Sequence, residues 1–348
     1  MKSSMQVAQF AAHGAPDVLR IVERPIPEPA AGEVLVRMLA VSLNHLDLWA
    51  RRGMPGLKLP MPFIPGSDGC GEVVACGAGV EGWSAGQRVV VLPGASSGTS
   101  AHDLAGNDFF SDDYQVRGEH FDGLDREFLC IESRYLLALP EGLDPVQVAA
   151  IPLVFITAWG ALIERAKLKA GETALILGGS SGVGSAGIQI AKDLGCWVIA
   201  TAGTEEKRAF SRSLGADEVV DHHDPNWSKT VKAMTGGRGA DVVFEHVGPA
   251  TWASSMRSLA RNGRLVTCGG TTGPEVSILL PHLFIKNQSV LGSTMGPVRA
   301  YPEILRKVTE GAYRPTLHEV MPLSQIVRAH ELLEGGQVVG KIVVVPGE

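Results

Sequence analysis

Apolar residues follow two different periods along this chain, and the change between them divides it. Up to about residue 150 they come in short runs separated by glycine and proline, and from Val34 to Ala40 they alternate, which is the period of a half-buried strand. Residues 71–77 and 88–91 are two more strand candidates. The prolines at 25–29 and 60–65 exclude helix. This part predicts a compact β-rich domain, a partly open barrel.

From Glu172 onward, short apolar runs alternate with segments of helical period. The strand candidates are Ala174–Leu177, Trp197–Thr201, Glu218–Val220, Val242–Phe244, Arg264–Cys268 and Val290–Gly292. Helical stretches lie between several of them, as at Glu205–Leu214 and Thr251–Ala260. This alternation predicts βαβ units around a parallel sheet, an α/β domain. Helical signals from Asp144 to Lys169 mark the passage into it.

The stretch Leu175–Gly184 joins the first of these strands to a helix through a glycine-rich turn. Strand, glycine turn and helix N-terminus together bind a dinucleotide pyrophosphate, because missing Cβ atoms let the backbone approach the phosphates and the helix end offers free N–H groups. The residues expected to do so are Gly179, Ser181, Gly182 and Val183. An ordinary tight turn between strand and helix is the alternative.

Three further loops follow predicted strands at the edge where parallel sheets bind ligands. They are Thr201–Thr204, Glu245–Pro249 and Gly269–Gly273. From these loops and the neighbouring strand end we expect cofactor contacts by Thr201, His222, His246, Val247, Gly269, Gly270 and Thr271. For His222 and His246, a surface or packing role is an equal alternative.

The end of the second predicted strand favours NADPH over NADH. An NAD enzyme carries a carboxylate there for the ribose 2′-hydroxyl, and this chain has Ala202. Thr204 can hydrogen-bond a 2′-phosphate, and Lys207 or Arg208 can neutralise it. The alternative is that Thr204 only caps the next helix and Lys207 is solvated.

Composition narrows the class of protein. The chain has 348 residues, which favours two domains, and its formal net charge of −6 argues against nucleic acid as the main partner. No segment has about 20 uninterrupted apolar residues, and residues 1–6 lack the apolar core of a signal peptide, so we expect no membrane span. The five cysteines are scattered and form no C-x-x-C pair, which predicts reduced thiols in a cytoplasmic protein.

Two loops of the first domain place polar side chains beside glycine or proline, as functional loops do. One is Asn44–Gly53 and the other is Gly66–Gly69. For His45, Arg51 and Arg52 of the first loop, an ordinary solvated or structural role is the stronger interpretation. Residues 93–118 are a long polar excursion for which we expect little regular structure.

Together these features resemble the medium-chain dehydrogenase/reductase superfamily over nearly the full length. The motifs that carry the resemblance are Asn44-x-x-Asp47 with Gly53, Pro65–Gly69, Gly86–Val89, Thr157-Ala158, Gly179–Gly184, Leu214–Asp217 and Gly340-Lys341. The resemblance implies a GroES-like catalytic domain at residues 1–154 and 297–348, and a Rossmann domain at residues 155–296. It also implies a homodimer that pairs strands near Val290–Gly292 across a two-fold axis.

The same resemblance indicates that zinc is not bound. The catalytic zinc ligands of alcohol dehydrogenases align with Asn44, Ser67 and a residue near Leu153, none of which is a good zinc ligand. The four cysteines of a structural zinc align with Ser97, Ser100, Asp103 and Ser111. A replacement site built from His45, Asp47 and Asp68 is the alternative.

The zinc-free branch that this chain resembles is the quinone oxidoreductase group. We therefore expect NADPH-dependent hydride transfer to a small-molecule quinone or α,β-unsaturated carbonyl. Asn44 would orient substrate or nicotinamide, and Asp47 would act in catalysis or only brace its loop. Thr157 would contact the carboxamide, and Lys341 would reach the cofactor. The alternatives are an alcohol dehydrogenase acting on small alcohols or aldehydes, and a non-catalytic NADPH-binding protein.

Overall fold

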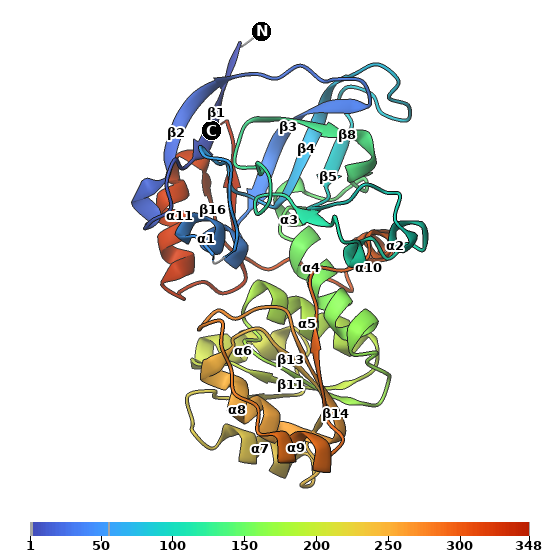
Figure 1. Ribbon diagram of the computed structural model, residues 1–348, viewed down its shortest axis with the longest axis vertical. Coiled ribbons are helices and arrows are strands. Elements are labelled where there is room, and N and C mark those ends of the chain that lie inside the picture. The colour runs from blue at the N-terminus through green and yellow to red at the C-terminus, as the bar shows by residue number, and fades with distance from the viewer. Residues whose placement is uncertain (1–2, 55, 348) are drawn as a thin grey trace. The chain divides into compact units, whose positions relative to one another are not determined.

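The computed structural model describes residues 3–54 and 56–347, and they form two compact units (Figure 1). The first unit runs to Leu153 and resumes at Pro315, and the second is Val154–Arg314. The second unit therefore includes residues 297–314, which were expected in the first. The reason is local, because Gln189 accepts from the backbone N of Arg314 at 2.7 Å and Asp193 accepts from the Tyr313 hydroxyl at 3.2 Å.

A seven-stranded sheet forms the body of the first unit, in the order β16-β17-β3-β4-β5-β9 with β8 also paired to β3. Its strands are β3 (Glu33–Ser42), β4 (Asp68–Cys76), β5 (Arg88–Val91), β8 (Phe128–Glu132), β9 (Leu136–Ala138), β16 (Leu317–Pro322) and β17 (Lys341–Val345). Strands β1 (Ser4–Gln9) and β2 (Arg20–Pro25) form a separate antiparallel pair in this unit. The GroES-like, β-rich unit is confirmed.

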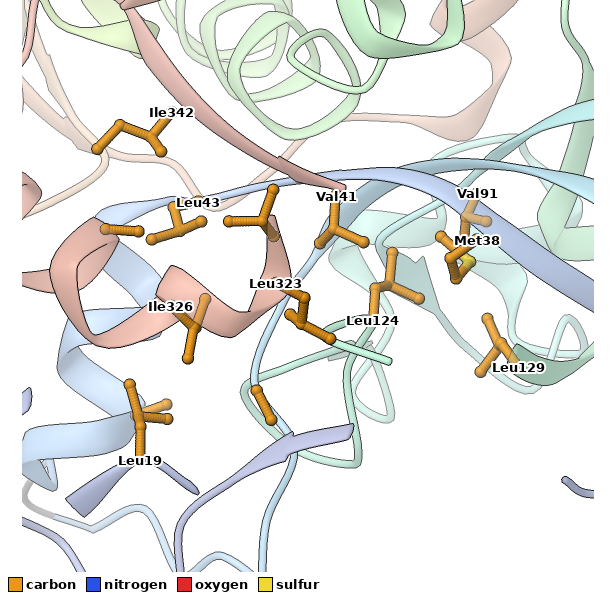
Figure 2. Close-up of a cluster of buried hydrophobic side chains, with 14 of the residues drawn as sticks. Leu19, Met38, Val41, Leu43, Val91, Leu124, Leu129, Leu323, Ile326 and Ile342 are labelled. Carbon is orange, nitrogen blue, oxygen red and sulfur yellow. The ribbon is translucent and has the colours of Figure 1, made fainter. Parts of the chain in front are cut away.

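The core of this unit lies between the sheet and α11 (Ile326–Glu334), as Figure 2 shows for Val41, Leu43, Leu323 and Ile326. Strand β3 contributes Val34, Val36 and Met38 and then changes phase to Val41 and Leu43. A register shift between Met38 and Ala40 causes the change. The expected alternation is thus correct as far as Met38, and Ala40 does not join this core.

The second unit has a six-stranded parallel sheet in the order β12-β11-β10-β13-β14-β15, the Rossmann strand order. The strands are β10 (Thr173–Ile176), β11 (Trp197–Thr201), β12 (Glu218–Val220), β13 (Ala240–Glu245), β14 (Leu259–Thr267) and β15 (Ser289–Gly292). Between them lie α5 (Gly182–Asp193), α6 (Glu205–Ser213), α7 (Trp227–Met234), α8 (Pro249–Ser258) and α9 (Leu280–Ile285) (Figure 1). The expected α/β domain is confirmed.

Three local predictions need correction or refinement. The helix expected at 251–260 ends at Ser258, because Leu259 already pairs with Ala240 of β13. The polar excursion holds only short elements: β6 (Gly94–Ala95), α2 (Ala101–Leu104), the single 3₁₀ turn Asp108–Phe110 and β7 (Gln115–Val116). The transition segment contains α3 (Pro145–Val148) and α4 (Pro152–Trp159), which continues as the π-helical turn Gly160–Arg165. After β15 come α10 (Tyr301–Thr309) and the turn Val298–Ala300.

Within residues 3–54 and 56–347, no helix combines the length and the apolar composition needed to cross a membrane.

Candidate functional site

A buried polar cluster of Asn44, Asp68 and Lys341 lies on the sheet of the first unit. The change of phase in β3 produces this cluster. After the change, Val41 faces the core and Ser42 faces the opposite side of the sheet. Register pairs Ser42 with Asp68 on β4 and with Val343 on β17, so Asp68 and Lys341 extend from the same face. All three residues of the cluster are at most 6% exposed.

Hydrogen bonds satisfy most of this cluster internally. The Asn44 Nδ2 donates to Asp68 Oδ2 at 3.0 Å and, more weakly, to the Ser42 carbonyl at 3.4 Å. The Lys341 ammonium donates to Asp68 Oδ2 at 3.2 Å and to Asn44 Oδ1. Both ends of the Asn44 amide are therefore engaged, and its orientation is fixed by an ion pair. The predicted role of Asn44 in orienting substrate or nicotinamide stays a prediction.

Asp47 joins two loops beneath this cluster. Its Oδ2 accepts from the Asn44 backbone N at 2.6 Å, at the start of α1 (His45–Arg52), and its Oδ1 accepts from the Gly66 N at 3.1 Å. The side chain is fully buried. These bonds give Asp47 the bracing role that was the alternative to catalysis, and they hold the segments of Asn44 and Gly66 together.

Burial sets the protonation behaviour of the cluster. It raises the pKa of Asp47 to about 6, although the backbone donors and the Lys341 charge act against the shift. It also raises the pKa of Asp68 and lowers that of Lys341, since removal from water disfavours both charges of the pair. Burial and the nearby charge of Asp47 raise the pKa of Asp125 well above its ordinary value.

The residues at the expected catalytic zinc positions do not fit that metal. Asn44 is engaged by Lys341, Leu153 is aliphatic, and Ser67 offers only a hydroxyl. Asp68 follows Ser67 in the chain, but its carboxylate already pairs with Lys341, whose ammonium lies 3.2 Å from Asp68 Oδ2. Cys, His, Asp and Glu are the usual zinc ligands. Across residues 3–54 and 56–347, no group of three or more such side chains could hold a metal ion.

The expected structural zinc positions carry a hydroxyl–carboxylate network instead. The Ser100 and Ser111 hydroxyls lie 2.6 Å apart, and Asp103 accepts from the Ser96 hydroxyl at 2.7 Å and from the Ser100 N at 2.9 Å. These bonds, with that of Ser96 foremost, lower the pKa of Asp103 to about 2. Ser97 bonds to Thr99 and, through its backbone N, to Asp113. Hydrogen bonds thus supply cross-links within this lobe.

The glycine-rich turn of the second unit has the geometry of a phosphate-binding turn. Gly178 has a φ of +55°, and its N–H donates to Thr201 Oγ1 at 3.0 Å. The Ser181 hydroxyl accepts from the Gly184 N at 3.0 Å and so caps α5. A Cβ on Gly184 would lie 2.1 Å from the Gly178 carbonyl oxygen, so this position requires glycine. The helix N-terminus at Ser181, Gly182 and Val183 is partly exposed, and its first turn carries no acid.

The ends of β11 and β12 bring Thr201 and His222 together, with His222 Nδ1 3.4 Å from Thr201 Oγ1. Ala202 is buried, and no carboxylate stands in its place. Thr204 caps α6, since its hydroxyl accepts from the Lys207 N at 3.2 Å. The alternative of a helix cap is thus correct for Thr204, and a cofactor contact by Thr204 or Lys207 stays a prediction.

Arg208 is paired with acids rather than held ready for a phosphate. Its guanidinium lies 3.0 Å from Glu205 and 3.1 Å from Asp221. His223 beside Asp221 contacts the His222 ring and the Gly203 carbonyl, with Nδ1 3.2 Å from that oxygen.

The loops after β13 and β14 are bonded to each other. Thr271 bonds to the His246 carbonyl through its hydroxyl at 3.2 Å, and the Thr272 N donates to the Val247 carbonyl at 2.8 Å. The His246 ring nitrogen Nε2 lies 2.7 Å from the Leu177 carbonyl oxygen. This contact links the ring to the residue directly before the glycine turn. A Cβ on Gly270 would lie 2.5 Å from the Gly273 carbonyl oxygen. The Thr267 hydroxyl donates to the Gly269 carbonyl at 3.1 Å.

Sequence reasoning missed Glu245, whose side chain holds the loop after β13 by hydrogen bonds. Its buried carboxylate accepts from the backbone N of Val247 at 2.7 Å and of Gly248 at 3.0 Å, and from the hydroxyls of Thr251 and Ser255. The available signal for this role was an acid at the end of an apolar strand, three residues before Gly248.

Thr157 lies buried on α4, and its hydroxyl donates to Met295 Sδ at 3.7 Å. The close approach of Gly160 to Met295, where a Cβ would lie 1.9 Å from the Met295 carbonyl oxygen, keeps these two segments together. The carboxamide contact expected of Thr157 stays a prediction.

Comparison with known proteins assigns the family. The alcohol dehydrogenase GroES-like domain matches residues 30–141, and the zinc-binding dehydrogenase family matches residues 182–310. The quinone oxidoreductase of Pseudomonas aeruginosa is 31% identical over 97% of this chain and 98% of its own. The chain belongs to the medium-chain dehydrogenase/reductase superfamily. Within it, the chain falls in the quinone oxidoreductase-like branch.

Two further similarities agree with the superfamily. The quinone oxidoreductase of Sus scrofa is 31% identical over 95% of this chain and 93% of its own. A crystal structure of an NAD-dependent alcohol dehydrogenase has a TM-score of 0.95 and 41% identity, with 98% of this chain and all of that chain covered. This medium-chain protein is therefore an oxidoreductase of an NAD(P)-dependent family.

Proposed function

We propose that this medium-chain oxidoreductase uses NADPH, without zinc, to transfer hydride to a quinone or an α,β-unsaturated carbonyl compound. The observation that carries the proposal is the Asn44–Asp68–Lys341 cluster, in which the residue at one expected zinc position, Asn44, is bonded to a carboxylate and an ammonium. Oxidising an alcohol without a Lewis acid requires a strong base. Reducing an electron-poor double bond requires no such base, only hydrogen-bond donors for the oxygen on which charge collects.

The second unit supports NADPH as the cofactor. Ser181, Gly182 and Val183 would hold the pyrophosphate, while Thr204, Lys207 and His222 would face the ribose that carries the 2′-phosphate. Bound NADPH would supply a hydride and remain as NADP⁺. The buried Ala202 leaves no carboxylate to repel a 2′-phosphate.

A second candidate function is alcohol dehydrogenation. The solved structure at 41% identity is named an NAD-dependent alcohol dehydrogenase, and that name favours NADH and an alcohol for its own reaction. The two functions differ in metal content, cofactor and substrate, so one experiment separates them.

The experiment is metal analysis of the purified protein, with oxidation of NADPH and of NADH by four acceptors measured before and after dialysis against a chelator. The acceptors are a benzoquinone, a naphthoquinone, an enone and an aldehyde. Substoichiometric zinc with quinone or enone reduction unchanged by chelation, and NADPH preferred at least 10-fold, is the expected result. Stoichiometric zinc with aldehyde reduction lost on chelation would replace the proposal by the alcohol dehydrogenase. Tight NADPH binding without turnover would favour a binding protein.

We also propose that the protein is a homodimer. The outer edge of β15 has no partner strand among the residues described, and the preceding segment exposes Leu279, Leu280 and Phe284, each at least 60% exposed. An open sheet edge beside apolar side chains favours pairing with a second copy.

The five cysteines are all unpaired thiols, which supports a reducing compartment such as the cytoplasm.

A further inference from the structure

A cleft of about 470 Å³ lies in the first unit, and no residue of the Asn44–Asp68–Lys341 cluster lines it. The pair β6–β7 forms one wall with Ala95 and Gln115, and β8 forms another with Ile131. Small-molecule sites in proteins commonly have volumes of this size. The cleft is therefore a candidate binding site that the proposed function does not use.

Arg117 is the buried charge on the wall of this cleft. Its side chain is 7% exposed, its Nε has no hydrogen-bond partner, and no ion pair joins it to an acid in the part of the chain that the structure describes. Burial, followed by the nearby charge of Arg126, lowers the pKa of the guanidinium to about 10, so it remains a cation at neutral pH. Buried charges are normally paired, because their removal from water is otherwise costly. This cation therefore suggests an anionic partner that comes from outside the chain.

The position of the Arg117 guanidinium is fixed by its surroundings. The Arg117 N donates to the Pro93 carbonyl at 2.8 Å, and a β-bridge joins Arg117 to Phe121. The guanidinium carbon lies 4.8 Å from the centroid of the Phe121 ring. Since this ring covers a face of the guanidinium, the N–H groups at its edge remain for an acceptor, and their fork matches a carboxylate.

The acids that line the cleft limit the charge of its ligand. Glu33 and Asp113 each accept from a backbone N at 3.0 Å, and Glu132 pairs with Arg134 at 2.8 Å. Asp113 and Glu132 are exposed, so they lie at the opening rather than at the buried wall. Their negative charges repel a dianion such as phosphate more strongly than an anion with a single charge.

We propose that this cleft binds a small aromatic monocarboxylate, whose carboxylate accepts hydrogen bonds from the Arg117 guanidinium. The rings of Phe121 and Tyr135 and the side chain of Ile131 line the cleft and suit an aromatic body. Binding is non-covalent and leaves the ligand unchanged. The inference does not rest on the proposed function, because every residue of the cleft belongs to the first unit and the site requires no NADPH.

The test is calorimetric titration of the purified full chain with benzoate. The expected result is saturable binding of one benzoate per chain, with a Kd below about 1 mM. Benzamide has the same shape without the charge, and it is expected to bind at least about 10-fold more weakly, as is inorganic phosphate. Benzamide that binds as tightly as benzoate, or phosphate that binds more tightly, would overturn the proposal. Failure of benzoate to bind would do the same and leave the proposed oxidoreductase function standing.

Two variants locate the site. Arg117→Gln removes the charge and is expected to weaken benzoate binding at least about 10-fold, whereas the same change at Arg88, an exposed arginine of β5 outside the cleft, is expected to leave the Kd unchanged. Gln115→Trp keeps Arg117 and fills the cleft from an exposed position of β7, so it is expected to abolish binding while urea unfolding stays that of the parent. It decides the matter should Arg117→Gln fail to fold. Parental affinity in either folded variant would refute the site.

Discussion

Four donors converge on the carboxylate of Glu245: the Val247 and Gly248 backbone N–H groups and the Thr251 and Ser255 hydroxyls. The loop after β13 therefore takes its shape from one buried side chain rather than from its own sequence. A carboxylate suits this position because both its oxygens accept and neither donates.

Replacing Glu245 by Gln tests this role. The amide turns one acceptor into a donor that faces other donors, so the free energy of unfolding is expected to fall by about 2–3 kcal/mol. Urea unfolding followed by fluorescence would measure the loss. Glu206→Gln, at an exposed position of α6, is the control and is expected to change stability by less than about 0.5 kcal/mol. Equal stability of both variants would contradict the role.

His330 connects stability to pH in the first unit. It is fully buried on α11, neither ring nitrogen has a hydrogen-bond partner among the described residues, and burial lowers its pKa to about 3. The unfolded chain takes up a proton near pH 6.5 while the folded chain does not, so this group reduces stability as the pH falls.

His330→Leu removes this effect. Between pH 7.5 and 5.5, the free energy of unfolding of the parent is expected to fall by about 1.4 kcal/mol more than that of the variant. Urea unfolding at the two pH values measures the difference, and the exposed His318→Gln serves as the control. Identical losses in the parent and His330→Leu would show that His330 is protonated in the folded state.

At the scale of elements, the shift of register in β3 decides which face of the strand carries polar side chains. Before it, Val34, Val36 and Met38 face the core, and after it Val41 and Leu43 do. The other face then carries Ser42 and leads directly to Asn44. The bulge in β3 thus places polar side chains on the same face as those of β4 and β17. β-bulges commonly redirect side chains in this way.

The turn before α5 is the second element whose geometry is demanding. Gly184→Ala places a Cβ against the Gly178 carbonyl oxygen, a backbone atom that yields only if the turn opens. We expect at least a 10-fold loss of NADPH affinity in a fluorescence titration. Gly187→Ala, three residues further along α5, meets side chains rather than backbone, with Phe244 at 3.0 Å and Ile176 at 3.4 Å. This control is expected to lose stability but keep its affinity, and an equal loss of affinity in both would refute the argument.

At the scale of the whole molecule, the proposed dimer depends on an apolar surface next to the sheet edge. Phe284→Glu places a charge on the exposed face of α9, where the wild-type ring is 65% exposed. We expect the parent to have twice the chain mass of 36.8 kDa by light scattering, and the variant to have the mass of one chain at micromolar concentration. Leu104→Glu, at another exposed apolar residue in the first unit, is expected to remain dimeric. A monomeric parent would exclude the dimer.

The sequence by itself determined the two architectures and the position of the glycine-rich turn. Strand Glu218–Val220 and strand Arg88–Val91 have the predicted limits, because each is a short β-branched run that begins at a charged residue. The glycine turn was predictable since only glycine fits the approach of Gly184 to Gly178. The residue types at the expected zinc positions were readable from the sequence, and the absence of zinc stays a prediction.

Only the tertiary structure decided which polar groups meet. Lys341 lies 297 residues from Asn44 in the chain, and no local pattern indicates that its ammonium reaches that amide. The cleft that Arg117 lines and the donors gathered by Glu245 depend likewise on segments brought together by folding. Sequence period determines which face of an element is buried, whereas hydrogen bonds between distant side chains depend on strand register and on the bulge in β3, which the period does not encode.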